Sequence, residues 1–132
     1  MKKITLLIFA NCFLFFSCSS SKHIDRFQKI QYKSITRGYS IQILLQGDTL
    51  KYFQNNNETL SLIISKEVKN SLNKLLKKVY PERLHTLKAP SNKFQYDGAM
   101  HTTLEIIWNG KTYKSDGFDD DNPPKKLSPF IN

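Results

Sequence analysis

Residues 39–53, YSIQILLQGDTLKYF, decide the fold class. Apolar and polar side chains alternate on both sides of Gly47-Asp48, which is typical of half-buried strands. A two-residue Gly-Asp loop between such runs predicts a hairpin with a primed turn. The implied register places three pairs side by side: Leu45 with Leu50, Ile43 with Tyr52, and Leu44 with Lys51.

A second hairpin is predicted in residues 104–114, where alternating runs flank Asn109-Gly110. Asn-Gly is the strongest short hairpin signal, because both residues tolerate a positive φ. An opposite-charge pair would then lie on the solvent face, as cross-strand energetics favour. The facing pairs are Ile106 with Tyr113 and Glu105 with Lys114.

Between the hairpins, residues 66–79 predict a helix with one apolar stripe. Ser65 is a good N-cap, and Glu67 lies in the first turn, where the helix dipole favours negative charge. Pro81 ends the helix. The stripe consists of Val68, Leu72, Leu75, Leu76 and Val79.

The rest of the chain is less regular. A strand is expected from near Lys29 to the break at Gly38, and another over residues 60–64. Residues 80–101 are too long for a structureless loop and are expected to be partly structured or functional, with Phe94 and Tyr96 in a short strand. Residues 125–131 suggest a last helical turn.

These elements predict an α+β fold: an antiparallel β-meander of about four to six strands against one main α-helix, residues 66–79. The expected order is three strands, the helix and two strands. A single globular domain is expected over residues 29–132. The order resembles that of small uncharacterised bacterial exported domains and, more distantly, of emfourin-type protease inhibitors.

The N-terminal sequence is typical of an export signal. Two lysines precede an apolar run over residues 4–16, which is too short to cross a bilayer as a helix. The run ends at Ser17-Cys18, which resembles the bacterial lipobox and, with phenylalanine before it, Bacteroidota lipoprotein signals. The resemblance implies a signal peptide at 1–17, lipidation of Cys18 and a flexible tether at 18–28. An ordinary signal peptide and a short buried helix are the alternatives.

Position 19 bears on the location of such a lipoprotein. Aspartate after the lipidated cysteine is the common signal for retention in the inner membrane, and this chain has Ser19. No acidic residue occurs between the cysteine and Asp25, although lipoproteins sent to the cell surface often carry acids there. The resemblance therefore implies the outer membrane, on the side that faces the periplasm.

Charge and cysteine content narrow the function classes. The chain has 20 basic and 11 acidic residues, an excess that suits nucleic acid, anionic lipid or an acidic protein. The export signal argues against nucleic acid. With Cys12 and Cys18 as the only cysteines, no disulfide is expected in the domain. The candidate interaction surface consists of Lys66, Lys69, Lys74, Lys77, Tyr96 and Asp97, although a solvated helix face would look the same.

No motif indicates catalysis or a cofactor. The histidines at 23, 85 and 101 lack metal-ligand spacing, and residues 116–122, DGFDDDN, do not match a calcium loop and read as a solvated turn. Serine-nucleophile and phosphate-loop motifs are missing. Paired carboxylates of a glycosidase would have to come from Asp48, Glu58, Glu82 and Asp97.

The sequence therefore predicts a lipid-anchored envelope protein with a binding or structural role, without metal, cofactor or catalysis. Its partners would be the membrane and one envelope protein. A periplasmic protease inhibitor or an immunity protein is the alternative, and an undetected hydrolase is the third hypothesis. The oligomeric state stays open.

Overall fold

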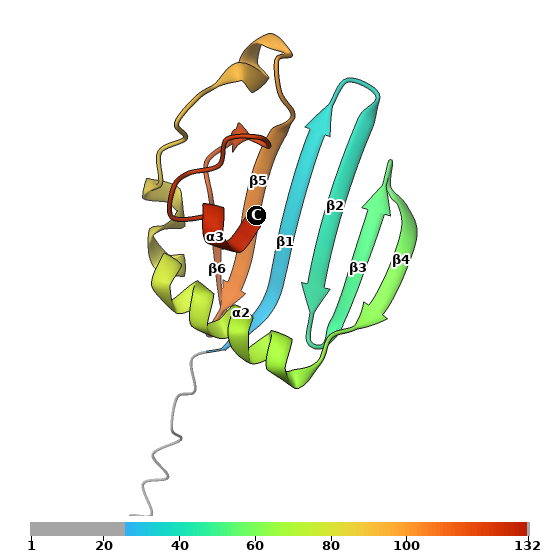
Figure 1. The fold of residues 1–132 in the computed structure, drawn as a ribbon, viewed down its shortest axis with the longest axis vertical. Helices are drawn as coiled ribbons and strands as arrows, with labels where there is room; N and C mark the ends of the chain where they lie inside the picture. The colour runs from blue at the N-terminus through green and yellow to red at the C-terminus, as the bar shows by residue number, and fades with distance from the viewer. Residues whose placement is uncertain (1–25, 132) are drawn as a thin grey trace, which may run out of the picture.

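The computed structural model describes residues 26–131, so Cys18 and most of the expected tether lie outside the described residues. Figure 1 shows one antiparallel sheet with a helix across one end of it. The strand order is β4-β3-β2-β1-β5-β6; β7 also pairs with β5, at the start of that strand, whereas β6 pairs with its end. The strands are β1 (Phe27–Thr36), β2 (Tyr39–Gln46), β3 (Thr49–Gln54), β4 (Asn57–Ile63), β5 (His101–Trp108), β6 (Lys111–Lys114) and β7 (Phe118–Asp119). The helices are α2 (Lys66–Val79) and α3 (Ser128–Ile131), with 3-10 helices η2 (Pro81–Thr86) and η3 (Lys93–Tyr96).

The predicted fold class and main helix are confirmed. The hydroxyl of Ser65 accepts a hydrogen bond from the N–H of Val68 at 3.3 Å, which satisfies a free donor at the start of α2. The helix ends at Tyr80, whose φ of 59° is left-handed, and Pro81 follows. The expected order of three strands, the helix and two strands needs correction: β1 is a full strand, so four strands precede the helix, and the two-residue β7 makes three strands after it.

Both hairpin registers are confirmed, including all the facing pairs that the sequence predicts. The second turn has positive φ at both central residues, 50° at Asn109 and 76° at Gly110, as a primed turn requires. Glu105 faces Lys114 across the hairpin, but its ion pair, at 3.0 Å, is with Lys29 on the neighbouring β1.

The segment between α2 and β5 was harder to predict. It holds the two 3-10 helices, and the expectation of a short strand at Phe94 and Tyr96 is wrong, because both lie in η3. The expected last turn is the short helix α3. These elements are short and irregular, so periodicity carries little information about them.

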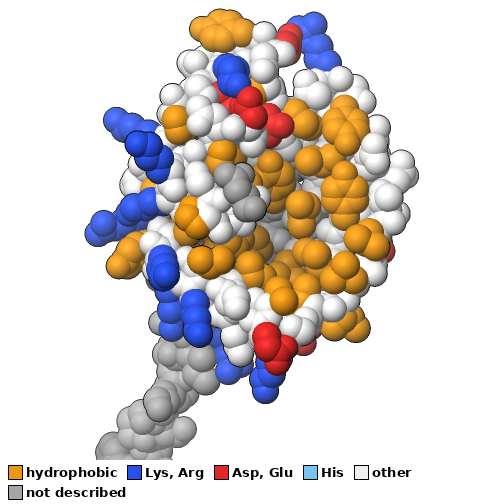
Figure 2. All heavy atoms as spheres, in the orientation of Figure 1, with side chains coloured by type: hydrophobic (Ala, Val, Ile, Leu, Met, Phe, Trp, Pro, Cys, Tyr) orange, Lys and Arg blue, Asp and Glu red, His pale blue; other side chains and the backbone are white. Residues whose placement is uncertain are grey.

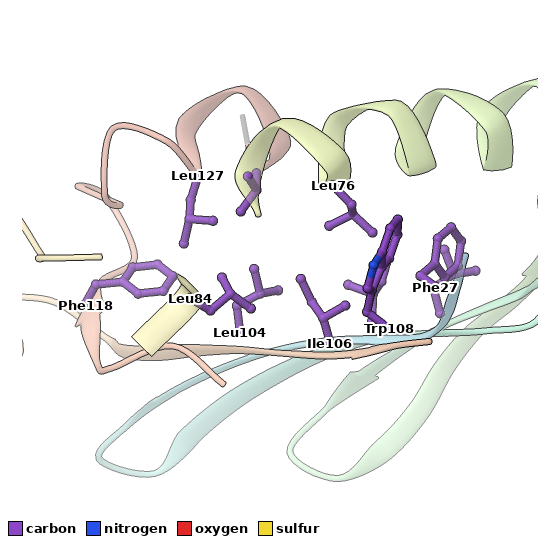
Figure 3. Packing of buried hydrophobic residues seen from close by; sticks show 11 residues of the cluster. Phe27, Leu76, Leu84, Leu104, Ile106, Trp108, Phe118 and Leu127 are labelled. Atoms are coloured by element: carbon purple, nitrogen blue, oxygen red, sulfur yellow. The ribbon is translucent and has the colours of Figure 1, made fainter. Parts of the chain in front are cut away.

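The core lies under one half of the sheet only. Figure 3 shows side chains of β1, β5 and α2 packed together with those from the C-terminal segment. β2 adds only Leu45, and no residue of β3 or β4 belongs to the buried core. The buried core consists of Phe27, Ile30, Leu45, Leu76, Val79, Leu84, Leu104, Ile106, Trp108, Phe118 and Leu127. The apolar face of the sheet is therefore wider than the layer that covers it.

Candidate functional site

Two rows of mostly aliphatic side chains cross the covered face of the sheet from β5 to β4. The first row consists of Ile106, Ile30, Leu45, Leu50 and Leu62, and the second of Leu104, Tyr32, Ile43, Tyr52 and Leu60. The side chains at the β4 end of each row are more exposed than those at the β5 end. Leu104 and Ile106 on β5 are fully buried, whereas Leu62 and Leu60 on β4 are 39% and 52% exposed. The apolar face thus continues beyond the helix into solvent.

Helix α2 leaves this half of the sheet uncovered because its apolar stripe meets the sheet only near its C-terminal end. Leu76 and Val79 are buried and Leu72 is partly buried, but Val68, at the start of the stripe, is 48% exposed. The short helix α3, which lies in front of β5 in Figure 1, adds Phe130 and Ile131 to the side chains packed against the core. No described element covers the face of β3 and β4.

A hollow of about 350 Å³ lies where the covered and uncovered halves meet. We call it the apolar hollow; it is lined by Ile30, Tyr32, Ile41, Ile43, Leu45, Leu50, Leu72, Phe130 and Ile131. Figure 2 shows it within a continuous apolar surface over β1 to β4. Most of the lysine and arginine side chains in this view lie along the left and lower margins of the molecule. Its size and lining are those of a site for a small apolar ligand.

In addition to Tyr32 in its lining, two tyrosines place polar groups beside the apolar hollow. Tyr52 lies next to Ile43 in the second row, and Tyr39 is on the same face of β2. Partial burial, and then the hydrogen bond with the Tyr39 side chain, raise the pKa of Tyr52. The Tyr52 phenol is therefore neutral at physiological pH and can orient a ligand by hydrogen bonds without adding charge.

The predicted lysine surface lies at the end of the sheet where the described chain begins. Lys66 and Lys69 line a second, more polar hollow of about 310 Å³ together with Arg26, just before β1. Lys69 forms an ion pair with Asp48 there. Lys74 and Lys77 are exposed farther along α2, so the four lysines share one helix.

Tyr96 and Asp97 do not join the lysines. Tyr96 is 78% exposed in η3, and Asp97 forms a 2.9 Å ion pair with Arg37, which follows the far end of β1. Arg26, beside the lysines, and Arg37, beside Asp97, lie at opposite ends of the ten-residue strand β1. The two ends of this strand are about 30 Å apart. The structure divides the candidate interaction surface between opposite ends of the molecule.

The acids of the tail serve the fold. Asp119, in the stretch predicted to be a solvated turn, is fully buried, so that expectation is wrong for this residue. Its carboxylate accepts hydrogen bonds from the Ser91 hydroxyl at 2.5 Å and from the N–H groups of Lys93 and Phe94 at 2.9 and 2.8 Å. Lys93 also forms a 2.5 Å ion pair with Asp121.

The acids considered for catalysis do not meet at one site. Asp48, Glu58 and Asp97 form separate ion pairs with Lys69, Lys51 and Arg37, and Glu82 is exposed in η2. His101 stacks obliquely on Phe94, with ring centres 4.7 Å apart, and His85 is exposed. Within residues 26–131, no three histidine, cysteine, aspartate or glutamate side chains are grouped as metal ligands.

The sequence predicts the strand residues of the apolar hollow as one face of half-buried strands and does not single them out as a site. Alternation places Ile41, Ile43 and Leu45 on one face and cannot tell which of them a helix will cover. A signal was nonetheless present: four strands offer more apolar surface than one 14-residue helix can cover.

The comparisons identify no relative: no protein-family model, no curated protein sequence and no solved structure matches the chain. None of the helices in the described part of the chain is long and apolar enough to span a bilayer.

Proposed function

We propose that this chain is a lipid-anchored protein of the bacterial cell envelope that binds a long acyl chain in the apolar hollow, without catalysis. The observation that carries the proposal is the hollow itself, because it leaves mostly aliphatic side chains of three strands and two helices open to a ligand. The anchor is Cys18, and the location is the periplasmic side of the outer membrane, as the N-terminal sequence favours.

The lining favours an acyl chain over a polar ligand. Apart from Tyr32, every residue of the hollow has a hydrocarbon side chain, and burial of each methylene contributes about 0.8 kcal/mol. The hydroxyls of Tyr39 and Tyr52 lie on the same face, where they can hydrogen-bond the polar head of an amphiphile. Envelope membranes supply such amphiphiles in quantity.

The position of the basic residues supports the anchor. Arg26 and Lys66 line one hollow at the end of the sheet from which the chain leads back to Cys18. A tether from this end would bring them close to the membrane surface. Attraction to anionic headgroups there is worth about 1 kcal/mol for each basic residue.

The other hypotheses receive less support. A hydrolase needs catalytic groups that converge, and Asp48, Glu58 and Asp97 form separate surface ion pairs. A protease inhibitor or an immunity protein would recognise a partner protein, whereas the hollow has the size of a small-molecule site.

Two isoleucines with similar exposure on opposite faces of the sheet test the proposal. Ile43, 37% exposed, lines the hollow, and Ile35, 42% exposed, lies on the other face. We expect the Ile43→Asn variant to weaken binding of radiolabelled palmitate to the immobilised full chain by tenfold or more, because it places an amide in the path of the hydrocarbon. The Ile35→Asn variant should bind as the parent chain does.

Equal loss of binding in both variants, or no measurable binding by the parent chain, would contradict the proposal. Thermal unfolding of both variants checks that each is folded at the temperature of the assay.

A further inference from the structure

We propose that two copies of this chain pair in antiparallel fashion through the outer edge of β4, which joins their sheets into one. This inference goes beyond the acyl-chain site and does not depend on it. It rests on the unpaired edge of β4, on the direction of its backbone groups and on its self-complementary side chains.

The two edges of the sheet are treated differently. β6 has only four residues and lies against η2, so that edge is short and has a neighbouring element. β4 has seven residues, all exposed, and no other strand among residues 26–131 pairs with its outer side. A long exposed edge is a template for another strand unless the chain protects it.

Only the first half of β4 is protected. A register irregularity lies between Glu58 and Leu60, and Glu58 forms an ion pair with Lys51; both features discourage pairing at an edge. The second half, Leu60–Ile63, has no charge, no proline and no irregularity. Its Leu60 and Ile63 are 52% and 79% exposed, which makes this half the place for a partner strand.

The backbone direction follows from one hydrogen bond beyond the end of β4. The N–H of Ile64 donates to the carbonyl of Asp48 at 2.9 Å, so Ile64 directs its backbone groups toward β3. Successive residues of an antiparallel strand direct their N–H and C=O groups to opposite sides. Leu62, two residues before Ile64, therefore also directs its groups toward β3. Ser61 and Ile63 therefore direct their N–H and C=O groups to the open edge.

The side chains match a second copy in one register. If Ser61 faces Ser61 of the second copy, its outward N–H and C=O groups form a reciprocal pair of hydrogen bonds. Leu60 then lies opposite Leu62 of the second copy on the apolar face, and the reverse pair forms by symmetry. Ile63 faces Thr59 of the second copy, which lies at the irregularity and ends the pairing, and no charged residue meets a like charge. The two exposed leucines of each copy are covered by this arrangement.

The contact is modest. It joins about five residues from each copy, which is less than the roughly 20 residues a side of a standard interface. Association should therefore depend on protein concentration and increase where copies are held on one membrane.

Cysteine crosslinking in envelope membranes tests the register with the full chain. The Ser61→Cys variant should form a disulfide-linked dimer on mild oxidation, because facing Cα atoms in a hydrogen-bonded pair are about 5.5 Å apart, within disulfide range. The Thr59→Cys variant is the matched control. Two copies of it would be offset by four residues along the strand, so it should not crosslink with itself. The parent chain measures the background from Cys12 and Cys18.

A second pair of variants tests the backbone contact. The Ser61→Pro change removes an outward N–H that β3 does not use, and edge strands tolerate proline at such positions. We expect it to abolish co-isolation of two differently tagged copies, while Ser61→Ala retains it; thermal unfolding checks that both are folded. Absence of the Ser61→Cys dimer, equal crosslinking of Thr59→Cys with itself, or co-isolation that a folded Ser61→Pro variant preserves would overturn the proposal.

Discussion

At the scale of single residues, Asp119 shows how the irregular half of the chain is held in place. Its buried carboxylate ties β7 to Ser91 and to the start of η3. Burial alone would raise its pKa, but hydrogen bonds from Ser91, Phe94 and Lys93, together with the Lys93 charge, outweigh burial and hold the pKa below its ordinary value of 3.8. The ionised form is therefore the one that the fold stabilises.

This predicts a specific loss of stability in acid. A carboxyl whose pKa is lowered on folding contributes fully above its ordinary pKa, and the contribution disappears as the pH falls through the folded value. We expect the Asp119→Asn variant to have a lower Tm at pH 7 and a smaller decrease in Tm between pH 5 and pH 3 than the parent chain.

Thermal unfolding followed by circular dichroism at several pH values would measure this. Asp116→Asn, which changes an exposed acid of the same tail, serves as the control and should match the parent. Parallel pH dependence in the parent chain and the Asp119→Asn variant would contradict the role of Asp119.

The sequence could not single out Asp119. It lies among neighbouring acids in the stretch DGFDDDN, and their local pattern resembles any polar turn. Its partners are 25 to 28 residues earlier, in a segment without periodicity. Long-range hydrogen bonds of this kind leave no local signal.

At the scale of elements, α2 illustrates what periodicity predicts well and what it does not. The sequence predicts the cap at Ser65, the end of the helix before Pro81 and the apolar stripe from Val68 to Val79. The same holds for the two hairpins, whose turns fix their registers. The sequence does not predict which residues of the stripe contact the sheet, because this depends on the angle at which the helix crosses the sheet.

The uneven use of the stripe predicts unequal effects of truncation. We expect the Leu76→Ala change to lower the free energy of unfolding by about 2–5 kcal/mol, because Leu76 is fully buried against the sheet. Val68→Ala should change it by less than about 1 kcal/mol, since Val68 is half exposed and alanine favours a helix. Urea unfolding of both variants would measure the difference, and similar losses would show that α2 covers the sheet along its whole length.

At the scale of the whole molecule, the layers are mismatched: the sheet has a wide apolar face and the helices cover one half of it. Exposed apolar surface of this extent costs stability and solubility unless something binds it. The uncovered half and the lysine-bearing end lie on different parts of the surface (Figure 2). A ligand on the uncovered half of the sheet is therefore compatible with a membrane contact at the lysine-bearing end.

The membrane attachment has its own test. If Cys18 carries the acyl groups, the Cys18→Ser variant should lose labelling by palmitate and move from the membrane fraction to the soluble fraction. Stable anchoring takes more than one acyl chain, and the Cys18→Ser variant would lack all of them. The loss from the membrane fraction should therefore be nearly complete. The Cys12→Ser variant is the matched control and should remain labelled. Unchanged labelling of Cys18→Ser would refute an anchor at this residue.

The central claim is that the apolar hollow holds an acyl chain, and site mapping with a photoreactive fatty acid tests it most directly. Palmitate carrying a diazirine in mid-chain would be irradiated with the full chain, and the labelled residues would be identified by mass spectrometry. We predict adducts on the lining residues of β2 and β3, such as Ile43 and Leu50, that excess palmitate suppresses. Adducts confined to the opposite face, at Leu44 or Phe53, or labelling that palmitate does not suppress, would contradict the claim.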